Sequence, residues 1–199
     1  MIKVGIMGGT FDPIHIGHLI LAMEAINFKK LDEVWFVPTG NPNFKQDKKI
    51  TDKYKRLEMV KICTRDNEKF KVCEYEVSKN DVTYTWETMK YFRENFDCDF
   101  YFIMGEDSLM SVETWENAVD FLKNTKILAC IRRQEEMSKL DEKIAELKSK
   151  GYFVEKIPSS FVDISSTSIR NKSMAKEDFR YFLKDEVYEY IKRNKLYES

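Results

Sequence analysis

The start of the chain most constrains its fold, because a strand, a glycine turn and a helix follow one another there almost without a break. Ile2, Val4 and Ile6 alternate with other residues, which predicts a strand of about six residues. The strand runs into Gly8-Gly9. A helix is predicted from Ile16 because apolar residues then recur at steps of three and four: Leu19, Ile20, Met23 and Ile26.

The glycine turn has the features of an anion site. Glycines at a strand end let a ligand approach the backbone, and the first turn of the next helix presents N–H groups and a partial positive charge. Anions bind readily at such helix ends. His15 and His18, the two histidines of the sequence, are three apart in this predicted first turn, so both can donate to one phosphate group. We therefore predict a phosphate-handling site.

Two other interpretations of the histidines stay open. One could be a surface residue and the other a hydrogen-bonded core residue, or the pair could bind zinc, for which histidine is a common ligand. The cysteines show no ligand-like spacing, so we predict no metal-binding side chains; they are Cys63, Cys73, Cys98 and Cys130.

The positions of Gly5, Gly8 and Gly9 fit neither the dinucleotide fingerprint nor the P-loop. The segment from Gly8 to His18 instead resembles the GGTFDPxHxGH signature of the nucleotidylyltransferase superfamily, whose HxGH element also occurs in class I aminoacyl-tRNA synthetases. The resemblance implies that ATP is bound by this segment, through Gly8, Gly9, Thr10, Phe11, His15 and His18.

Composition is typical of a compact enzyme. With 199 residues, 43% of them hydrophobic, the chain can bury one substantial core. The formal charge is −1, from 33 basic and 34 acidic residues, so no global field favours nucleic acid or a membrane surface. No apolar run approaches the roughly 20 residues of a membrane span. Scattered cysteines are most simply reduced thiols, and we expect a cytoplasmic protein.

Strand-like and helical runs alternate along the rest of the chain, which is typical of a parallel sheet covered on both faces. Further strands are predicted at 33–37, 70–77, 100–104, 126–131 and 152–157. Thr51 is a candidate N-cap for one helix, Trp86, Met89 and Phe92 mark another, and Ser138 and Gly151 bracket a third. We expect one α/β domain over 1–199, a doubly wound, Rossmann-like parallel sheet with a small C-terminal helical part. The irregular segment 39–50 is a candidate functional loop.

A second cluster lies near the C-terminus, where Ile164, Ser165, Ser166 and Ser168 precede Arg170. Hydroxyls before a helix are usually caps. With an arginine in the first turn, they also offer amides, hydroxyls and a fixed cation to a polyphosphate. The segment resembles the ISSTxIR motif of the same superfamily, which implies that these residues bind ATP.

The segments between the two motifs resemble the bacterial nicotinate-nucleotide adenylyltransferase family nearly end to end. Residues 37–45 resemble its VPxxxPPHK loop, 84–88 its SYTxxTL, and 103–109 with Trp115 its IxGADxLxxLxxW. Asn43 and Phe44 replace the second proline and the histidine of the loop, while its lysine is kept as Lys45.

This resemblance implies roles that compete with simpler ones. It places Trp115 against a nicotinate ring and Thr85 near the ring carboxylate, and it gives Gly105 and Asp107 hydrogen bonds to the ATP ribose. Trp115 could instead be core, Asp107 a helix N-cap, and Arg132 and Arg133 surface charge. The family has a basic residue near here, which makes Arg133 a candidate phosphate contact.

The implied reaction joins ATP and nicotinate mononucleotide to give nicotinate adenine dinucleotide and pyrophosphate, a step of NAD biosynthesis. The resemblance implies that His18 contacts the α-phosphate of ATP and that His15 steadies the triphosphate. It also implies that Lys45 and Arg170 neutralise the charge that develops on the phosphates. Mg²⁺ is expected, held chiefly by phosphates and water. Because family members are often dimers or larger, a homodimer is expected, with no nucleic-acid or membrane partner.

Four alternatives remain. The acceptor could be nicotinamide mononucleotide, because a few hydrogen bonds at the ring decide between acid and amide, or it could be phosphopantetheine, whose adenylyltransferases share both motifs. The chain could be a nucleotide-binding regulatory module that has lost catalysis. Finally, residues 15–18 and the partial KMSKS-like 137–139 echo a synthetase fragment, although the chain lacks room and charge for tRNA binding.

Overall fold

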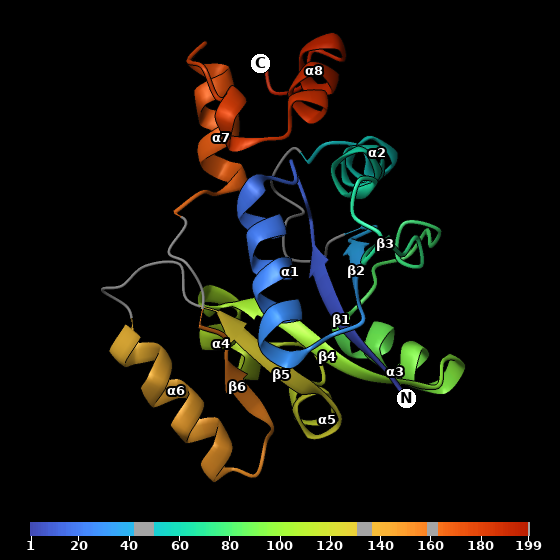
Figure 1. Ribbon diagram of the computed structural model, residues 1–199, viewed down its shortest axis with the longest axis vertical. Helices are drawn as coiled ribbons and strands as arrows, with labels where there is room; N and C mark the ends of the chain where they lie inside the picture. The colour runs from blue at the N-terminus through green and yellow to red at the C-terminus, as the bar shows by residue number, and fades with distance from the viewer. Residues whose placement is uncertain (42–49, 131–136, 159–162, 199) are drawn as a thin grey trace. The chain divides into compact units, whose positions relative to one another are not determined.

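The computed structural model describes residues 1–41, 50–130, 137–158 and 163–198, and its centre is a six-stranded sheet in the order β3-β2-β1-β4-β5-β6 (Figure 1). The pairs β1–β4, β4–β5 and β5–β6 are parallel. This doubly wound, Rossmann-like sheet confirms the predicted fold class. The strands are β1 Ile2–Gly9, β2 Glu33–Pro38, β3 Phe70–Val72, β4 Cys98–Gly105, β5 Lys126–Cys130 and β6 Val154–Lys156.

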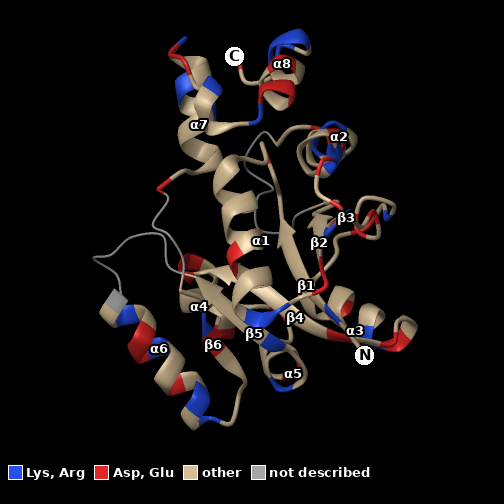
Figure 2. Cartoon of the chain, viewed as in Figure 1, with Lys and Arg blue, Asp and Glu red and all other residues tan. Residues whose placement is uncertain are grey.

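Helices connect the strands, and charged residues concentrate on α2, α3, α6 and α8, while β1, β4 and α1 carry few of them (Figure 2). In the described ranges no helix has both the length and the apolar character needed to cross a bilayer. The helices are α1 Ile16–Lys29, α2 Lys53–Thr64, α3 Thr85–Asn95, α4 Glu106–Ser111, α5 Ala118–Asn124, α6 Met137–Ser149, α7 Ser166–Met174 and α8 Asp185–Arg193, with 3₁₀ turns η2 Val112–Thr114 and η4 Arg180–Phe182.

The chain divides into two compact units. Unit 1 comprises Met1–Gly8, Leu21–Trp35 and Tyr84–Val162, and unit 2 comprises Gly9–Ile20, Phe36–Thr83 and Asp163–Ser199. From Gly9 onward, the glycine–histidine turn therefore belongs to the same unit as the C-terminal serine–arginine motif.

Unit 1 is built on close packing around β1. Val4 and Ile6 are fully buried. Between them, a Cβ on Gly5 would lie 2.7 Å from Ile103 Cδ1 and 2.8 Å from Leu31 Cδ1, both inside van der Waals contact. A glycine is therefore required at this position of the strand for the sheet to accept its covering side chains.

The strand order reverses beside β1, and this reversal places two predicted site residues. β1 and β4 run parallel in a register from Ile2↔Cys98 to Ile6↔Phe102, so their carboxyl ends share one edge of the sheet. Gly8 and Gly105 lie at these ends. Open α/β sheets bind ligands at such a topological switch point.

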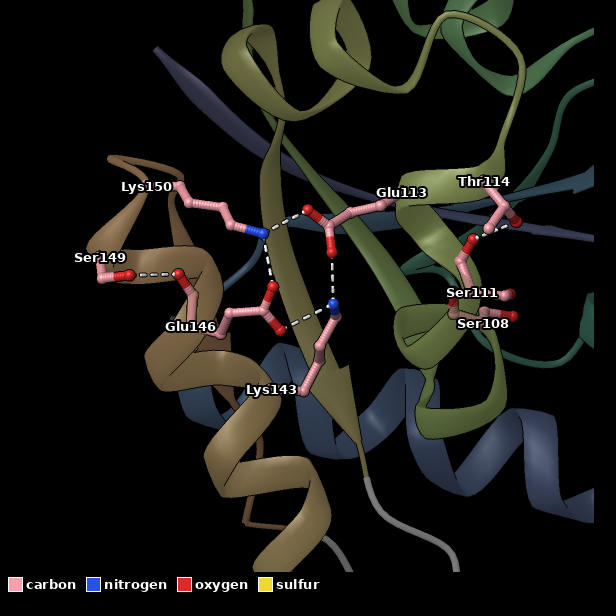
Figure 3. A network of polar contacts seen from close by, with 8 residues as sticks. All are labelled: Ser108, Ser111, Glu113, Thr114, Lys143, Glu146, Ser149 and Lys150. Carbon is pink, nitrogen blue, oxygen red and sulfur yellow. Dashed lines mark hydrogen bonds and ion pairs between the residues drawn. The ribbon is translucent and has the colours of Figure 1, made fainter.

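A charged network ties η2 to α6 in unit 1 (Figure 3). Lys143 of α6 and Lys150, which directly follows α6, each contact both Glu113 of η2 and Glu146 of α6. The Lys150 Nζ–Glu113 Oε1 distance is 2.7 Å and the Lys143 Nζ–Glu146 Oε2 distance is 2.9 Å. Since Trp115 directly follows η2, the network anchors the turn that presents this side chain.

Unit 2 gathers α2, α7, α8 and β3, and α2 packs against both α8 and β3. Lys184 Nζ contacts Asp66 Oδ2 at 2.9 Å, which joins the end of α2 to the start of α8. The N-cap of α2 is Asp52, whose Oδ1 accepts hydrogen bonds from the backbone N–H groups of Tyr54 and Lys55. The predicted Thr51 cap is therefore wrong by one residue.

Other predicted boundaries also change. The strand predicted at 70–77 ends at Val72, because the chain turns there and Ser78 N donates to Glu74 O at 2.9 Å. Helix α6 contains Ser138 instead of following it. Gly151 does end that helix as predicted, with a φ of 85° that favours glycine and its N–H donating to Lys148 O.

The charged network predicts a pH-dependent effect on stability. Hydrogen bonds from Lys143 and Lys150 lower the pKa of Glu113 from 4.5 to about 2. A carboxylate with a lowered pKa stabilises the fold above its ordinary pKa and loses that contribution as the pH falls through the lowered value. We expect Glu113→Gln to lower the Tm by about 1–3 °C at pH 7, because exposed ion pairs contribute little.

The difference in Tm between wild type and Glu113→Gln should narrow steadily below about pH 4.5. Glu142→Gln, which changes an exposed carboxylate of α6 outside the network, serves as the control and should show no such trend. A gap that does not vary with pH would contradict the role given to the network.

Candidate functional site

The glycine–histidine turn, which follows β1, has a strained backbone. Phe11 has a φ of 49°, which is unusual for a bulky residue, and its side chain is only 2% exposed. A Cβ on Gly9 would lie 3.2 Å from two atoms of the Phe11 ring, so the glycine makes room for that ring. The ring in turn meets the His18 imidazole edge-on, with centroids 5.0 Å apart. Strain of this kind is concentrated at functional sites.

The two imidazoles lie against each other, with ring centroids 3.7 Å apart and an interplanar angle of 35°. His15 N donates to His18 Nδ1 at 3.2 Å, and His18 N donates to His15 O at 2.9 Å. Helix α1 begins at Ile16, so His15 precedes the helix instead of lying in its first turn, as we had predicted. The structure still brings both rings together, as the prediction of a shared ligand requires.

The backbone contact fixes the tautomer of His18. Because His18 Nδ1 accepts a hydrogen bond, it carries no proton, and the neutral ring holds its proton on Nε2. Nε2 is then a hydrogen-bond donor, the form of imidazole that binds a phosphate oxygen.

Gly17 is the position that lets the His15 ring adopt this place. A Cβ there would lie 3.0 Å from His15 Nδ1 and 3.1 Å from His15 Cε1. The His15 ring, which is 2% exposed, would have to shift. The glycine between the histidines is thus explained by the packing of the ring.

The C-terminal motif docks directly on this turn within unit 2. Ser166 Oγ donates to Pro13 O at 2.8 Å, and Arg170 Nη1 donates to Asp12 O at 2.6 Å. Ile164 also lies beside Gly17, since a Cβ on Gly17 would be 3.8 Å from Ile164 Cβ. The two motifs, far apart in sequence, therefore meet through backbone carbonyls.

The hydroxyl groups of this motif make hydrogen bonds within the protein. Ser165 is the N-cap of α7, because its Oγ accepts from Ser168 N at 3.1 Å. Ser168 Oγ donates to Ser165 O, and Arg170 Nη2 donates to Thr167 Oγ1 at 3.2 Å. The capping interpretation therefore holds for Ser165, while Ser166 and Arg170 join the motifs.

The turn is also stabilised by three residues that were not predicted as site residues, namely Arg56, Asp12 and Tyr197. Arg56 is 1% exposed and donates to three carbonyls: Thr51 O at 2.8 Å, Thr10 O at 2.6 Å and Gly40 O at 2.9 Å. Burial lowers the pKa of Arg56, and the nearby Asp12 carboxylate opposes this effect. Asp12 in turn accepts a hydrogen bond from Tyr197 at 2.7 Å. Asp12 was within the quoted motif, but nothing in the sequence marks Arg56 or Tyr197.

The candidates for the ribose and the nicotinate ring belong to unit 1. Thr85 begins α3. Gly105, not Asp107, is the N-cap of α4, so the capping alternative for Asp107 is wrong and its side chain is exposed in the first turn. Trp115 is half-buried, with its ring centroid 5.5 Å from that of Phe121.

Other candidates lie outside the described residues, namely Asn43, Phe44, Lys45, Arg132 and Arg133. Among the residues that the structure does describe, no group of three or more His, Cys, Asp or Glu side chains is arranged to hold a metal ion.

Comparison with known proteins assigns the family. The cytidylyltransferase-like family model matches residues 6–172. A probable nicotinate-nucleotide adenylyltransferase of Clostridium novyi (strain NT) is 40% identical over 202 residues, which cover 100% of both chains. The chain belongs to the nicotinate-nucleotide adenylyltransferase family. A second member, from Clostridium acetobutylicum, is 39% identical over 205 residues, with 99% of this chain and 100% of the relative covered.

Solved structures agree with this nicotinate-nucleotide adenylyltransferase fold. Plasmodium falciparum nicotinic acid mononucleotide adenylyltransferase complexed with NaAD matches with a TM-score of 0.81 at 22% identity, covering 100% of this chain and 98% of that one. The same protein complexed with APC matches with a TM-score of 0.76 at 20% identity, with the same coverage. The family resemblance and the fold class predicted from the sequence are thereby confirmed.

The contact between Gly17 and His15 gives a prediction that separates activity from stability. Gly17→Ala adds a Cβ that displaces the His15 ring, yet it raises helix propensity by about 0.5–1 kcal/mol. We expect an unchanged or higher Tm together with a loss of about tenfold or more in kcat.

Asn27→Ala, at an exposed position of the same helix, raises helix propensity away from the turn and should leave kcat unchanged. Thermal melts and steady-state kinetics of both variants check the prediction. Wild-type kcat in Gly17→Ala would show that the position of the His15 ring does not matter.

Proposed function

We propose that this chain transfers the adenylyl group of ATP to nicotinate mononucleotide. A phosphate oxygen of the mononucleotide attacks the α-phosphorus, the bond from that phosphorus to the oxygen bridging to the β-phosphorus breaks, and pyrophosphate leaves. The observation that carries the proposal is the pair of imidazoles 3.7 Å apart, in a turn fastened by Ser166 and Arg170 of the second motif. The names of full-length relatives at about 40% identity support the choice of substrates.

The two histidines supply fixed donors for the triphosphate. His18, with its proton on Nε2, would contact the α-phosphate, and His15 would steady the neighbouring phosphates. Donors held in place before the reaction stabilise the charge that develops in transfer without reorganising. The backbone hydrogen bonds between His15 and His18, and the packing of Phe11 and Gly17 around the rings, would therefore hold these donors in place for catalysis.

Arg170 would bring a fixed positive charge to the same phosphates. A guanidinium has five N–H donors, and its contacts with Asp12 and Thr167 use two of them. Lys45 is proposed as a second cation. Gly8, Gly9, Thr10, Ile164, Ser165 and Ser168 complete the proposed ATP contacts.

The unit 1 candidates would bind the nucleosides. We assign Gly105 and Asp107 to the ATP ribose, Thr85 and Trp115 to the nicotinate ring, and Arg133 to the phosphate of the mononucleotide. The exposed Asp107 and the half-buried Trp115 ring support these roles, because each presents surface for a ligand. The family match spans residues of both units, which supports treating 1–199 as one nucleotidylyltransferase domain.

Mg²⁺ is proposed to accompany ATP. This ion keeps several waters and is usually bound through substrate phosphates, whose charge it neutralises. The homodimer and the cytoplasmic location stay predictions.

A pyrophosphate-release assay with ATP and one acceptor at a time tests the function. The acceptors are nicotinate mononucleotide, nicotinamide mononucleotide and phosphopantetheine. We expect the highest kcat/KM with nicotinate mononucleotide. A preference for either other acceptor would reassign the substrate, and nucleotide binding without turnover on any of the three would favour a regulatory module.

Replacement of His18 tests the role of its Nε2 donor. His18→Ala should fold normally and lose about 10²–10³ in kcat, the effect of removing one preorganised donor. His18→Gln, whose side-chain amide can place an N–H near the Nε2 position, should retain more activity than alanine. Turnover near the wild-type rate in the alanine variant would refute this role.

A further inference from the structure

The segment after α8 folds back in a conformation that needs support from its surroundings. Lys195 and Tyr197 have φ values of 49° and 62°, in the left-handed region that bulky residues rarely adopt. Leu196 between them is 8% exposed, and its N–H donates to Ile191 O at 3.0 Å. The surrounding contacts therefore fix the backbone at Tyr197, and with it the position from which the Tyr197 side chain extends.

The Tyr197 hydroxyl makes that contact with the glycine–histidine turn. It donates to Asp12 Oδ1 at 2.7 Å, and Asp12 is 4% exposed. Burial and the Asp12 charge raise the pKa of Tyr197, so the phenol stays protonated and remains a donor. A hydrogen bond from the Thr51 side chain and the charge of Arg170 lower the pKa of the same hydroxyl, but by less. The hydroxyl therefore lies where three separate segments of unit 2 meet.

Asp12 links this hydroxyl to the proposed ATP contacts. Its Oδ2 accepts from Thr51 N at 3.3 Å, and its backbone carbonyl accepts from Arg170 Nη1 at 2.6 Å. The charge of the buried Arg56 also faces Asp12. The carboxylate is thus held by Tyr197 and Thr51 and attracted by the Arg56 guanidinium, while Arg170 binds the backbone carbonyl of the same residue.

We propose that Tyr197 is a positioning residue for ATP, acting through Asp12; the proposal rests on the function given above. Without the hydroxyl, the buried Asp12 carboxylate loses a charged hydrogen bond, and leaving such an acceptor unsatisfied is costly. The carboxylate then turns toward the guanidinium groups and competes for Arg170, whose remaining donors are assigned to the phosphates. The defect should therefore appear in ATP binding and not only in stability.

Tyr197→Phe removes the hydroxyl and keeps the ring. We expect the dissociation constant of an ATP analogue with a methylene group between the α- and β-phosphorus atoms to rise about 3- to 10-fold by calorimetry. The KM for ATP should rise similarly, while the KM for nicotinate mononucleotide changes less than about twofold.

Tyr188→Phe is the matched control. Tyr188 is a half-buried tyrosine of α8 whose ring packs on Phe179, with centroids 5.1 Å apart. Its loss of a hydroxyl should leave both the affinity for the analogue and the KM values unchanged. A lower Tm in Tyr197→Phe with wild-type affinity for the analogue would show a purely structural tyrosine and overturn the proposal.

Asp12→Asn tests the same contact from the other side, and it does so even where the tyrosine variant folds poorly. Asparagine keeps an acceptor oxygen but removes the charge, so binding of the analogue should again weaken. The variant that combines Tyr197→Phe with Asp12→Asn should bind the analogue no more weakly than the single variant with the lower affinity. Both changes remove the same hydrogen bond, so their effects should not add. Fully additive losses would contradict the proposal.

The calorimetry also separates this inference from the proposed function. If wild type binds the analogue but releases no pyrophosphate with nicotinate mononucleotide, the function fails while the effect of Tyr197 on binding is still measured. If wild type turns over and Tyr197→Phe binds the analogue normally, the function stands and the inference fails.

Discussion

The hydrogen bonds from Ser166 and Arg170 to the carbonyls of Pro13 and Asp12 are the interaction on which the site depends. A chain that leaves a strand through a turn carries carbonyl groups with no sheet or helix partner, and buried polar groups of this kind need donors. α7 supplies them, at 2.8 and 2.6 Å. The same bonds bring the helix terminus and the arginine of the second motif to the turn that holds the histidines.

A buried cation supports the turn from the other side. Arg56 is 1% exposed, and a charge removed from water in this way is tolerated only when several partners compensate it. Three carbonyls and the facing Asp12 carboxylate do so. Arginine presents these donors from three nitrogens of a planar fork, whereas lysine has all of its donors on one nitrogen, so arginine suits carbonyls on three segments better. The strain at Phe11 is maintained because both sides of the turn are fixed.

Much of this arrangement could be predicted, because it depends on local pattern. The alternation from Ile2 to Ile6, the glycine turn and the apolar spacing after Ile16 predicted β1, the turn and α1, since strand and helix periods are properties of short windows. Gly151 ended α6 as expected. The capping of α7 likewise depends on residues within one turn of each other, Ser165 and Ser168.

The remainder depends on contacts that sequence spacing does not show. Thr51 and Asp52 are both competent caps, and the carboxylate caps α2 while the Thr51 backbone N–H is taken by Asp12. From the sequence alone, Arg56 resembles an ordinary surface charge on a helix, and Tyr197 resembles an ordinary residue near the chain terminus. Their roles come from segments that only the folded chain brings together, which is why neither was predicted.

With only two histidines in the sequence, the tautomer of His18 can be measured directly by long-range ¹H–¹⁵N NMR of protein labelled with ¹⁵N-histidine. The account predicts a His18 ring protonated on Nε2 with a bare Nδ1, and a change at Nε2 when the methylene analogue of ATP is added with Mg²⁺. A proton on Nδ1 in the neutral ring, or signals of both rings that do not respond to the analogue, would contradict it.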